Sequence, residues 1–230
     1  MSFEKPNPEQ MPTQEEMPQP EELQKSPGED MKSKYAKMLK MASEFNNPEN
    51  KEKDEKDPKI IDTVAALWTL EVATSQSCEG HLEHGRPYPW VMIEASNEPK
   101  QRFNDESNLK TEIAKRYNMP LDEINWRGDS KPAQELRNLG AANETEEYKK
   151  WRGENKKLYD KMAGWLNDFY KTREASADVK LRLDGPGDSA FEIRAGEESS
   201  DDQQNLEELI SKRQEEMNAF TQFLKEKYIG

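Results

Sequence analysis

An alternation of apolar and charged residues around one turn constrains the fold of this chain most strongly. In DVKLRLDGPGDSAFEIRAG, residues 178–196, every second side chain is apolar on both sides of the turn GPGD. A period of two predicts an antiparallel hairpin with one buried face and one solvated, charged face. The buried face is predicted to contain Val179, Leu181, Leu183, Phe191, Ile193 and Ala195, and the solvated face Lys180, Arg182, Glu192 and Arg194. Because an isolated hairpin is only marginally stable in water, other elements must cover its buried face.

Two further strands and several helices are predicted from the same kind of periodicity. Residues 73–78, ATSQSC, and 90–95, WVMIEA, are predicted strands, and the second should be interior because its first four residues are apolar on both faces. Apolar side chains spaced by three and four predict helices over residues 31–45, 57–72, 105–118, 131–139, 144–173 and 200–224. We therefore predict an α+β fold, in which a small, mostly antiparallel sheet of about four strands is covered by helices on one side.

Short polar residues mark where several of these helices should begin. The predicted N-terminal caps are Asp30, Asp57 with Pro58 in the first turn, Asn143 with Glu146, and Ser200 with Gln203; Gly140 is predicted to end the helix over 131–139. In each N-terminal cap, a side-chain oxygen is expected to accept a hydrogen bond from a backbone N–H of the first turn.

Composition divides the chain into a tail, a linker and a folded domain. Residues 1–30 are acidic and rich in proline, with too little apolar surface to offset the chain entropy, so they are predicted to be disordered. Residues 31–57 are predicted to form a weak helix followed by the charged linker NNPENKEKDEKDP. Residues 58–230 hold most of the aromatic residues and are predicted to form a single α+β domain.

Charge and hydropathy restrict the partners and the compartment. The formal net charge is −13, and residues 1–30 contribute −6 of it from eight acidic residues and two lysines. A nucleic-acid partner is therefore not expected, and the basic residues between 149 and 157 should form the solvated side of a helix. No apolar run is long enough to span a membrane, no signal peptide is recognisable, and one cysteine cannot form an intrachain disulfide, so we expect a cytoplasmic protein.

The only cysteine and both histidines lie close together, in TSQSCEGHLEHGRPYPW, residues 74–90. Such clustering favours a site over chance. Cys78, His81 and His84 offer a thiolate and two imidazoles, which are ligands that zinc accepts. A fourth position filled by water or a carboxylate would be typical of a catalytic zinc site, so zinc is the candidate cofactor.

Two other interpretations of the motif stay open. Cys78 could act as a nucleophile with His81 or His84 as its base, although the neighbouring Glu79 would oppose formation of the thiolate. Alternatively, the cysteine is buried and inert, and the histidines hydrogen-bond the turn. His81-Leu82-Glu83 is similar to the H-x-E of zinc deaminases, whose glutamate transfers protons; this chain lacks their P-C-x-x-C pair, and Glu83 is kept only as a candidate catalytic residue.

Residues around the motif are candidates for ligand binding. Ser77, Glu79 and Gly80 lie in the turn itself, and Arg86 lies in the proline-rich segment GRPYPW, where it is available for an anion. The predicted partner is a metal or a small anionic ligand. The alternative is a protein without enzymatic activity, in which the acidic tail or the helices recruit a protein partner and the motif is structural.

The segment also resembles known signatures. A helix followed by TSQSCEGH and then PYPWV is similar to bacterial and phage proteins that carry an SCEGH box, a family without an agreed activity. More distantly, TSQSCEGH resembles the signature of wybutosine-synthesis tRNA methyltransferases, which use S-adenosylmethionine. Thr74, Ser77, Cys78 and Gly80 match that signature, whereas Glu79 and His81 replace its serine and arginine. The second resemblance implies an RNA-base-modifying enzyme, and the loss of the arginine weakens the expectation of an RNA substrate.

Overall fold

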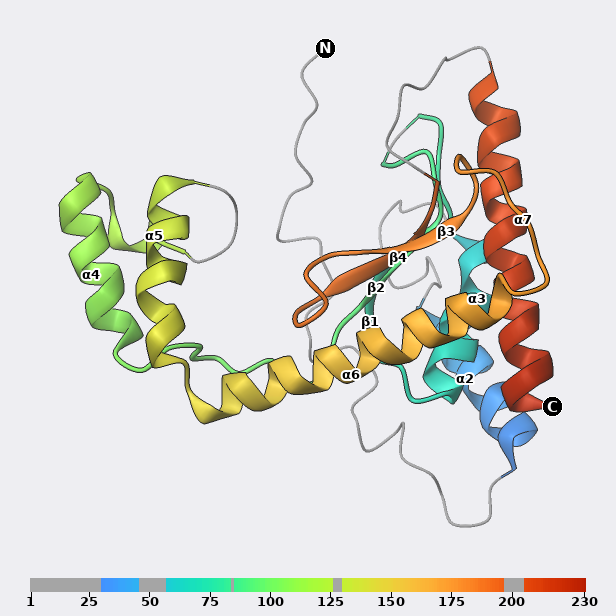
Figure 1. The fold of residues 1–230 in the computed structure, drawn as a ribbon, viewed down its shortest axis with the longest axis horizontal. Coiled ribbons are helices and arrows are strands. Elements are labelled where there is room, and N and C mark those ends of the chain that lie inside the picture. Colours follow the sequence, from blue (N-terminus) through green and yellow to red (C-terminus); the bar gives the residue numbers. More distant parts are fainter. Residues whose placement is uncertain (1–29, 46–56, 84, 126–129, 197–204) are drawn as a thin grey trace. The chain divides into compact units, whose positions relative to one another are not determined.

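The computed structural model describes residues 30–45, 57–83, 85–125, 130–196 and 205–230 (Figure 1). The predicted tail, except Asp30, and most of the predicted linker lie outside these residues. The chain divides into two compact units, one formed by residues up to Ser96 together with Lys156–Gly230, and the other by Asn97–Asn155. Each unit is described by itself.

The first unit is built on one antiparallel sheet. Its strands are β1 (Thr74–Cys78), β2 (Trp90–Ile93), β3 (Leu181–Asp184) and β4 (Phe191–Ala195), in the order β1-β2-β4-β3. All three pairings are antiparallel, and β3 and β4 form the predicted hairpin. The α+β fold is thus confirmed, and β2 is an interior strand as predicted.

One face of the sheet forms the hydrophobic core. The cross-strand row Val91, Ile193 and Leu183 lies on this face. Three helices contribute buried side chains to the same core, namely α3 (Pro58–Thr69), the part of α6 (Glu146–Phe169) from Lys156 onward, and α7 (Leu206–Leu224). The predicted covering of the sheet by helices on one side is therefore present.

The opposite face of the sheet carries polar residues, but it is less solvated than the alternation predicts. Arg194 and Glu192 are only 3% and 8% exposed. Arg194 pairs with Asp184 and its guanidinium lies 5.1 Å from the ring centre of Tyr88, while Glu192 pairs with Arg86. The prediction of a fully wet face was wrong here because the loop between β1 and β2 brings Tyr88 and Arg86 onto it, which a two-residue period cannot reveal.

Helix α2 (Met31–Phe45) docks on the first unit. Asp30 caps it as predicted, since its carboxylate accepts a hydrogen bond from the backbone N–H of Ser33 at 2.9 Å. Met38 and Ala42 are buried together with Trp68 and its neighbours on α3. The apolar stripe of this helix therefore has a partner, and the contact holds α3 from the side away from the sheet core.

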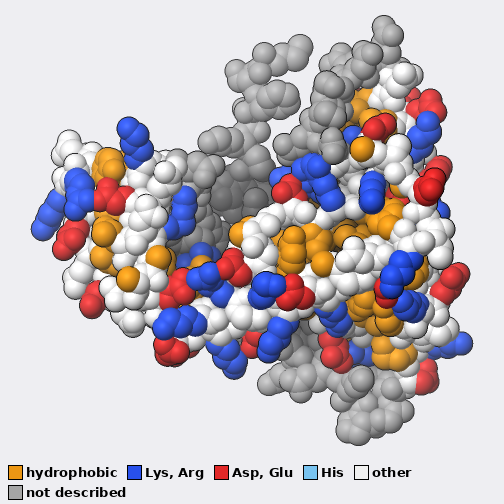
Figure 2. Space-filling model, viewed as in Figure 1, with side chains coloured by type: hydrophobic (Ala, Val, Ile, Leu, Met, Phe, Trp, Pro, Cys, Tyr) orange, Lys and Arg blue, Asp and Glu red, His pale blue; other side chains and the backbone are white. Residues whose placement is uncertain are grey.

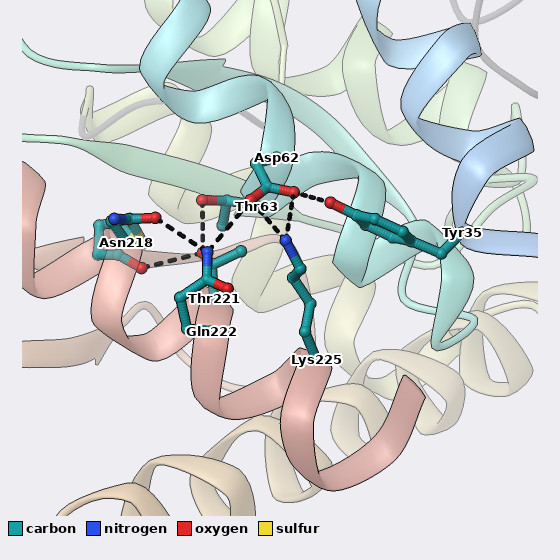
Figure 3. A network of polar contacts seen from close by, with 8 residues as sticks. Tyr35, Asp62, Thr63, Asn218, Thr221, Gln222 and Lys225 are labelled. Carbon is teal, nitrogen blue, oxygen red and sulfur yellow. Dashed lines mark hydrogen bonds and ion pairs between the residues drawn. The ribbon is translucent and has the colours of Figure 1, made fainter. Parts of the chain in front are cut away.

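A polar network joins α2, α3 and the end of α7 around Asp62 (Figure 3). Asp62, on α3, accepts a hydrogen bond from Tyr35 of α2 and forms an ion pair with Lys225 at 3.1 Å. Lys225 begins η7 (Lys225–Ile229), a π-helical turn that continues α7. Beside it, the hydroxyls of Thr63 and Thr221 share a buried hydrogen bond of 2.8 Å. These contacts fix the position of α3 and therefore of Asp57, the residue that precedes its first turn.

The second unit is helical. It contains α4 (Glu106–Tyr117), η4 (Leu121–Glu123), α5 (Lys131–Gly140), η5 (Ala141–Asn143) and the first part of α6. Tyr148 stacks on Trp151 with 5.6 Å between ring centres. Helix α5 ends at Gly140, as predicted, but with a right-handed φ of −73°. The glycine is needed for packing, because a Cβ there would lie 2.5 Å from the ring of Phe103.

Helix α6 is shorter than the predicted span 144–173 and has a different cap. The side chain of Thr145, not Asn143, accepts a hydrogen bond from the backbone N–H of Tyr148 at 3.2 Å. Asn143 instead uses its carbonyl to accept the backbone N–H of Asn104. The predicted capping pair Ser200 and Gln203 lies outside the described residues.

Candidate metal site

The site is positioned by the matched lengths of α3 and β1. Twelve residues of α3 rise by about 18 Å. After a tight turn, the five residues of β1 run back over about 16 Å. The end of β1, Cys78, is thereby returned to the start of α3, where Asp57 lies. The similar lengths of α3 and β1 thus bring Asp57 and Cys78, which are 21 positions apart in the sequence, close together in space.

Asp57, Cys78 and His81 form a compact group of potential metal ligands. One oxygen, sulfur or nitrogen from each residue lies within 4.8 Å of the corresponding atoms of the other two. His81 Nε2 is 2.6 Å from Asp57 Oδ1, and these side chains are only 16% and 19% exposed. Within the described parts of the chain this is the only group of three or more Cys, His, Asp or Glu residues with such geometry.

Asp57 reaches this group because another residue takes over its predicted role. Asp57 is the residue before α3, but its side chain makes no capping hydrogen bond. Instead, Glu79 Oε2 accepts the backbone N–H of Lys59 at 2.8 Å, so a carboxylate from the turn caps the helix. A negative charge at a helix N-terminus is favourable because the first N–H groups lack intrahelical partners. The exchange leaves the Asp57 carboxylate for His81.

The turn that carries Cys78 and His81 is held in place by hydrogen bonds from several sides. The backbone N–H of Gly80 donates to Cys78 Sγ at 3.3 Å, and that of His81 donates to the carbonyl of Arg86 at 3.1 Å. On the other side, the Gln214 amide of α7 donates to the carbonyl of Glu79 at 3.0 Å. The three candidate ligands therefore sit on a scaffold tied to α3, α7 and the loop leading to β2.

Gly80 is required at its position, and we predict that Gly80→Ala disrupts the site. Its φ is +88°, and a Cβ would lie 2.7 Å from the backbone carbon of Tyr88. We expect a loss of roughly 2 to 3 kcal/mol in the free energy of unfolding, measured by chemical denaturation. Gly85→Ala is the matched control, because Gly85 has φ +72° but nothing within 4 Å of a Cβ, so it should cost only about 1 kcal/mol. Equal losses would contradict a specific requirement at Gly80.

The electrostatics of the group disfavour a free thiolate. Burial raises the pKa of the Cys78 thiol to about 11, the N–H of Gly80 opposes the rise, and the charges of Asp57 and Glu79 add to it. The Arg86 guanidinium lowers the same pKa by a smaller amount. At neutral pH only about one thiol in ten thousand would be ionised, so Cys78 by itself is a poor nucleophile.

The remaining predicted site residues are placed as follows. Ser77 pairs with Val91 and lies on the core face, opposite to the face of Cys78. Glu83 is exposed and does not belong to the group of ligands. Arg86 forms an ion pair with Glu192 at 2.5 Å. His84 lies outside the described residues.

Sequence reasoning missed Asp57 as a site residue. Asp57 followed by Pro58 is a strong helix-start signal, so the carboxylate was assigned to the helix. The helix does start there, but its cap comes from Glu79, which is 22 positions further along the chain. A comparison of the predicted lengths of the helix and the strand could have placed Asp57 beside Cys78.

The basic residues of α6 are interspersed with acidic ones over the face drawn in Figure 2. Lys149 pairs with Glu146, Arg152 with Glu144, and Lys156 with Asp160. Neighbouring opposite charges reduce the positive potential that a phosphate backbone would meet. Lys149 and Lys156 are exposed, so they lie on the solvated side of the helix, as expected from the sequence.

None of the helices that the structure describes combines the length and the apolar run needed to cross a membrane. Comparisons with models of known protein families, with curated proteins and with solved structures find no match to this chain.

Proposed function

We propose that this protein binds a divalent transition metal, with zinc as the favoured ion, through Asp57, Cys78 and His81. The observation that carries this function is the approach of three different donor types to within 4.8 Å of one another. Donor atoms of a tetrahedral zinc site lie about 2.0 to 2.3 Å from the metal and so about 3.3 to 3.8 Å apart. Small side-chain rotations would bring the three atoms to this spacing.

The donor set favours zinc over hard cations. Magnesium and calcium take oxygen ligands, whereas a thiolate with an imidazole suits zinc and its chemical neighbours. A divalent cation would also compensate the negative charge of Asp57 and of the Cys78 thiolate. Metal ligation ionises a cysteine outright, which overcomes the raised pKa of this thiol. Three protein ligands leave a position open for water or a substrate, as in catalytic zinc sites.

Metal binding is tested by titrating the chelator-treated protein with cobalt, whose thiolate-to-metal absorption reports a bond to Cys78. We expect one equivalent to bind and zinc to displace it, because both ions accept the same tetrahedral donor set. Cys78→Ser should abolish the thiolate absorption, and His81→Gln and Asp57→Asn should each weaken binding by at least about tenfold.

Glu83→Gln is the matched control for Asp57→Asn, because Glu83 is an exposed carboxylate two residues from His81. This variant should bind cobalt as the parent does, and His84→Ala in parallel measures the contribution predicted for that histidine. Absence of the thiolate absorption in the parent protein would reject metal binding. The motif would then be structural, with the Asp57–His81 contact serving only to fasten the turn to α3.

A cysteine-dependent enzyme is the second candidate, favoured by one specific observation. The hydrogen bond between Asp57 and His81, close to Cys78, brings together the three residue types of a Cys-His-Asp triad, in which the carboxylate orients the histidine. The raised pKa of Cys78 opposes it, because a triad requires a thiolate that forms near neutral pH. The reactivity of Cys78 distinguishes the two functions.

A further inference from the structure

We propose that the ligand of this site carries an oxyanion group, a carboxylate or a phosphate, which binds between the metal and the Arg86 guanidinium. This inference rests on the metal binding proposed above. It adds the chemical class of the ligand and the residue that recognises it.

Arg86 lies beside the candidate ligands. Its carbonyl accepts the backbone N–H of His81 at 3.1 Å, so the two residues face each other across the loop. Its guanidinium carbon is 5.1 Å from the ring centre of Trp90. Trp90 is the direct cross-strand partner of Cys78, and directly paired residues project from the same face of a sheet. The guanidinium and the thiol therefore occupy one face of β1 and β2.

Arg86 is held in place while its head remains accessible. Both of its bonds to Glu192 start from Nη1, at 2.7 and 2.5 Å. The Arg86 side chain is 47% exposed, whereas that of Glu192 is 11% exposed. A guanidinium carries five N–H donors in a rigid fork, so pairing with Glu192 through one nitrogen and hydrogen bonding to Tyr88 still leave N–H donors for an oxyanion. Stacking on Trp90 and the buried counter-ion fix the fork before a ligand arrives.

The charges of the metal ligands explain why an anionic ligand would need a cationic side chain such as that of Arg86. Asp57 and the thiolate of Cys78 together neutralise a divalent cation, so the metal alone offers an anion no net positive charge. Glu79, the next carboxylate in the turn, is used at the start of α3. The Arg86 guanidinium is close enough for its charge to act on the Cys78 thiol, and an oxyanion that binds the metal through one oxygen could engage the guanidinium through another.

The test uses the cobalt-loaded full-length protein and two probes, acetate and inorganic phosphate, at constant ionic strength with chloride. We expect at least one probe to change the cobalt absorption in a saturable way. Arg86→Gln should weaken that response by at least about tenfold, and Arg86→Lys should restore only part of it because a lysine lacks the fork. A response to acetate alone identifies a carboxylate ligand, and a response to phosphate alone identifies a phosphoryl ligand.

Two variants control the measurement. Arg182 lies in the same cross-strand row as Trp90 but two strands further on, about 10 Å away, so Arg182→Gln should leave the response unchanged. Because Arg86→Gln leaves Glu192 without its counter-ion, the double variant Arg86→Gln/Glu192→Gln separates lost recognition from lost folding; it too should respond weakly.

The outcomes separate the two proposals. Failure of cobalt to bind would reject the metal site and this inference together. A normal cobalt spectrum with no response to either probe would overturn the oxyanion site alone, as would equal losses in Arg86→Gln and Arg182→Gln, which would indicate general electrostatics.

Discussion

Trp165→Ala is expected to lower the free energy of unfolding by roughly 3 to 5 kcal/mol, enough to unfold a marginally stable domain. Trp165 is 8% exposed and belongs to the core between α6, α7 and the sheet. Its ring centre lies 5.3 Å from that of Tyr228, and the Lys161 ammonium lies 4.9 Å from it. Truncation would open a cavity between elements that cannot readily close it.

Chemical denaturation followed by circular dichroism measures this loss. Trp165→Phe keeps a ring in the core and should lose clearly less. Leu82→Ala is the surface control in the same unit, since Leu82 is 46% exposed and its truncation should change stability by no more than about 0.5 kcal/mol. If Trp165→Ala left the free energy of unfolding nearly unchanged, the Trp165 side of α6 would not pack in the core.

The elements of this fold were predictable because their signals are local. The alternation around the 178–196 turn and the three-four spacing of α3 and α7 each lie within one segment, and the structure contains the corresponding hairpin and helices. Burial on the second sheet face was not predictable in the same way. It depends on Arg86 and Tyr88, which come from a loop about a hundred residues before the β4 residues that they cover.

The candidate site was predictable in part. The clustering of Cys78 and His81 in the sequence pointed to the turn that carries two of the three potential ligands. Asp57 was not recognised, because its sequence context fits a helix cap and nothing local reveals that Glu79 performs that role. Both Asp57 and Glu79 have a carboxylate that can cap α3, and only the folded structure shows which one reaches the first turn. The sequence around Asp57 fits a cap even though Glu79 provides it.

The interpretation of Cys78 has consequences for how the protein would act. A metal ligand need not be reactive in the metal-free protein, because the metal itself displaces the proton. A nucleophile must be ionised before its substrate arrives, and its histidine and carboxylate must assist that ionisation. A metal site predicts an unreactive thiol in the metal-free protein, whereas a nucleophile predicts a reactive one. In the first case the Asp57 charge slows the reaction of the thiol, and in the second it speeds it.

Alkylation of Cys78 in the metal-free folded protein is expected to be about a hundredfold slower at pH 7 to 8 than in the chain unfolded by denaturant. Burial and the neighbouring carboxylates raise the pKa of this thiol from 9.0 to about 11. The rate of reaction with iodoacetamide should therefore rise about tenfold per pH unit, without levelling off below pH 10. The chelator must be present throughout, since bound metal would also protect the sulfur.

Asp57→Asn gives the decisive comparison. The charge of Asp57 raises the pKa of Cys78, so its removal should lower that pKa and speed alkylation at a given pH. In a Cys-His-Asp triad the same change would misorient the histidine and slow the reaction. Glu83→Gln, which removes an exposed carboxylate from the same turn, should have little effect. Fast alkylation of the parent protein at neutral pH, slowed by Asp57→Asn, would replace the metal site with a cysteine nucleophile.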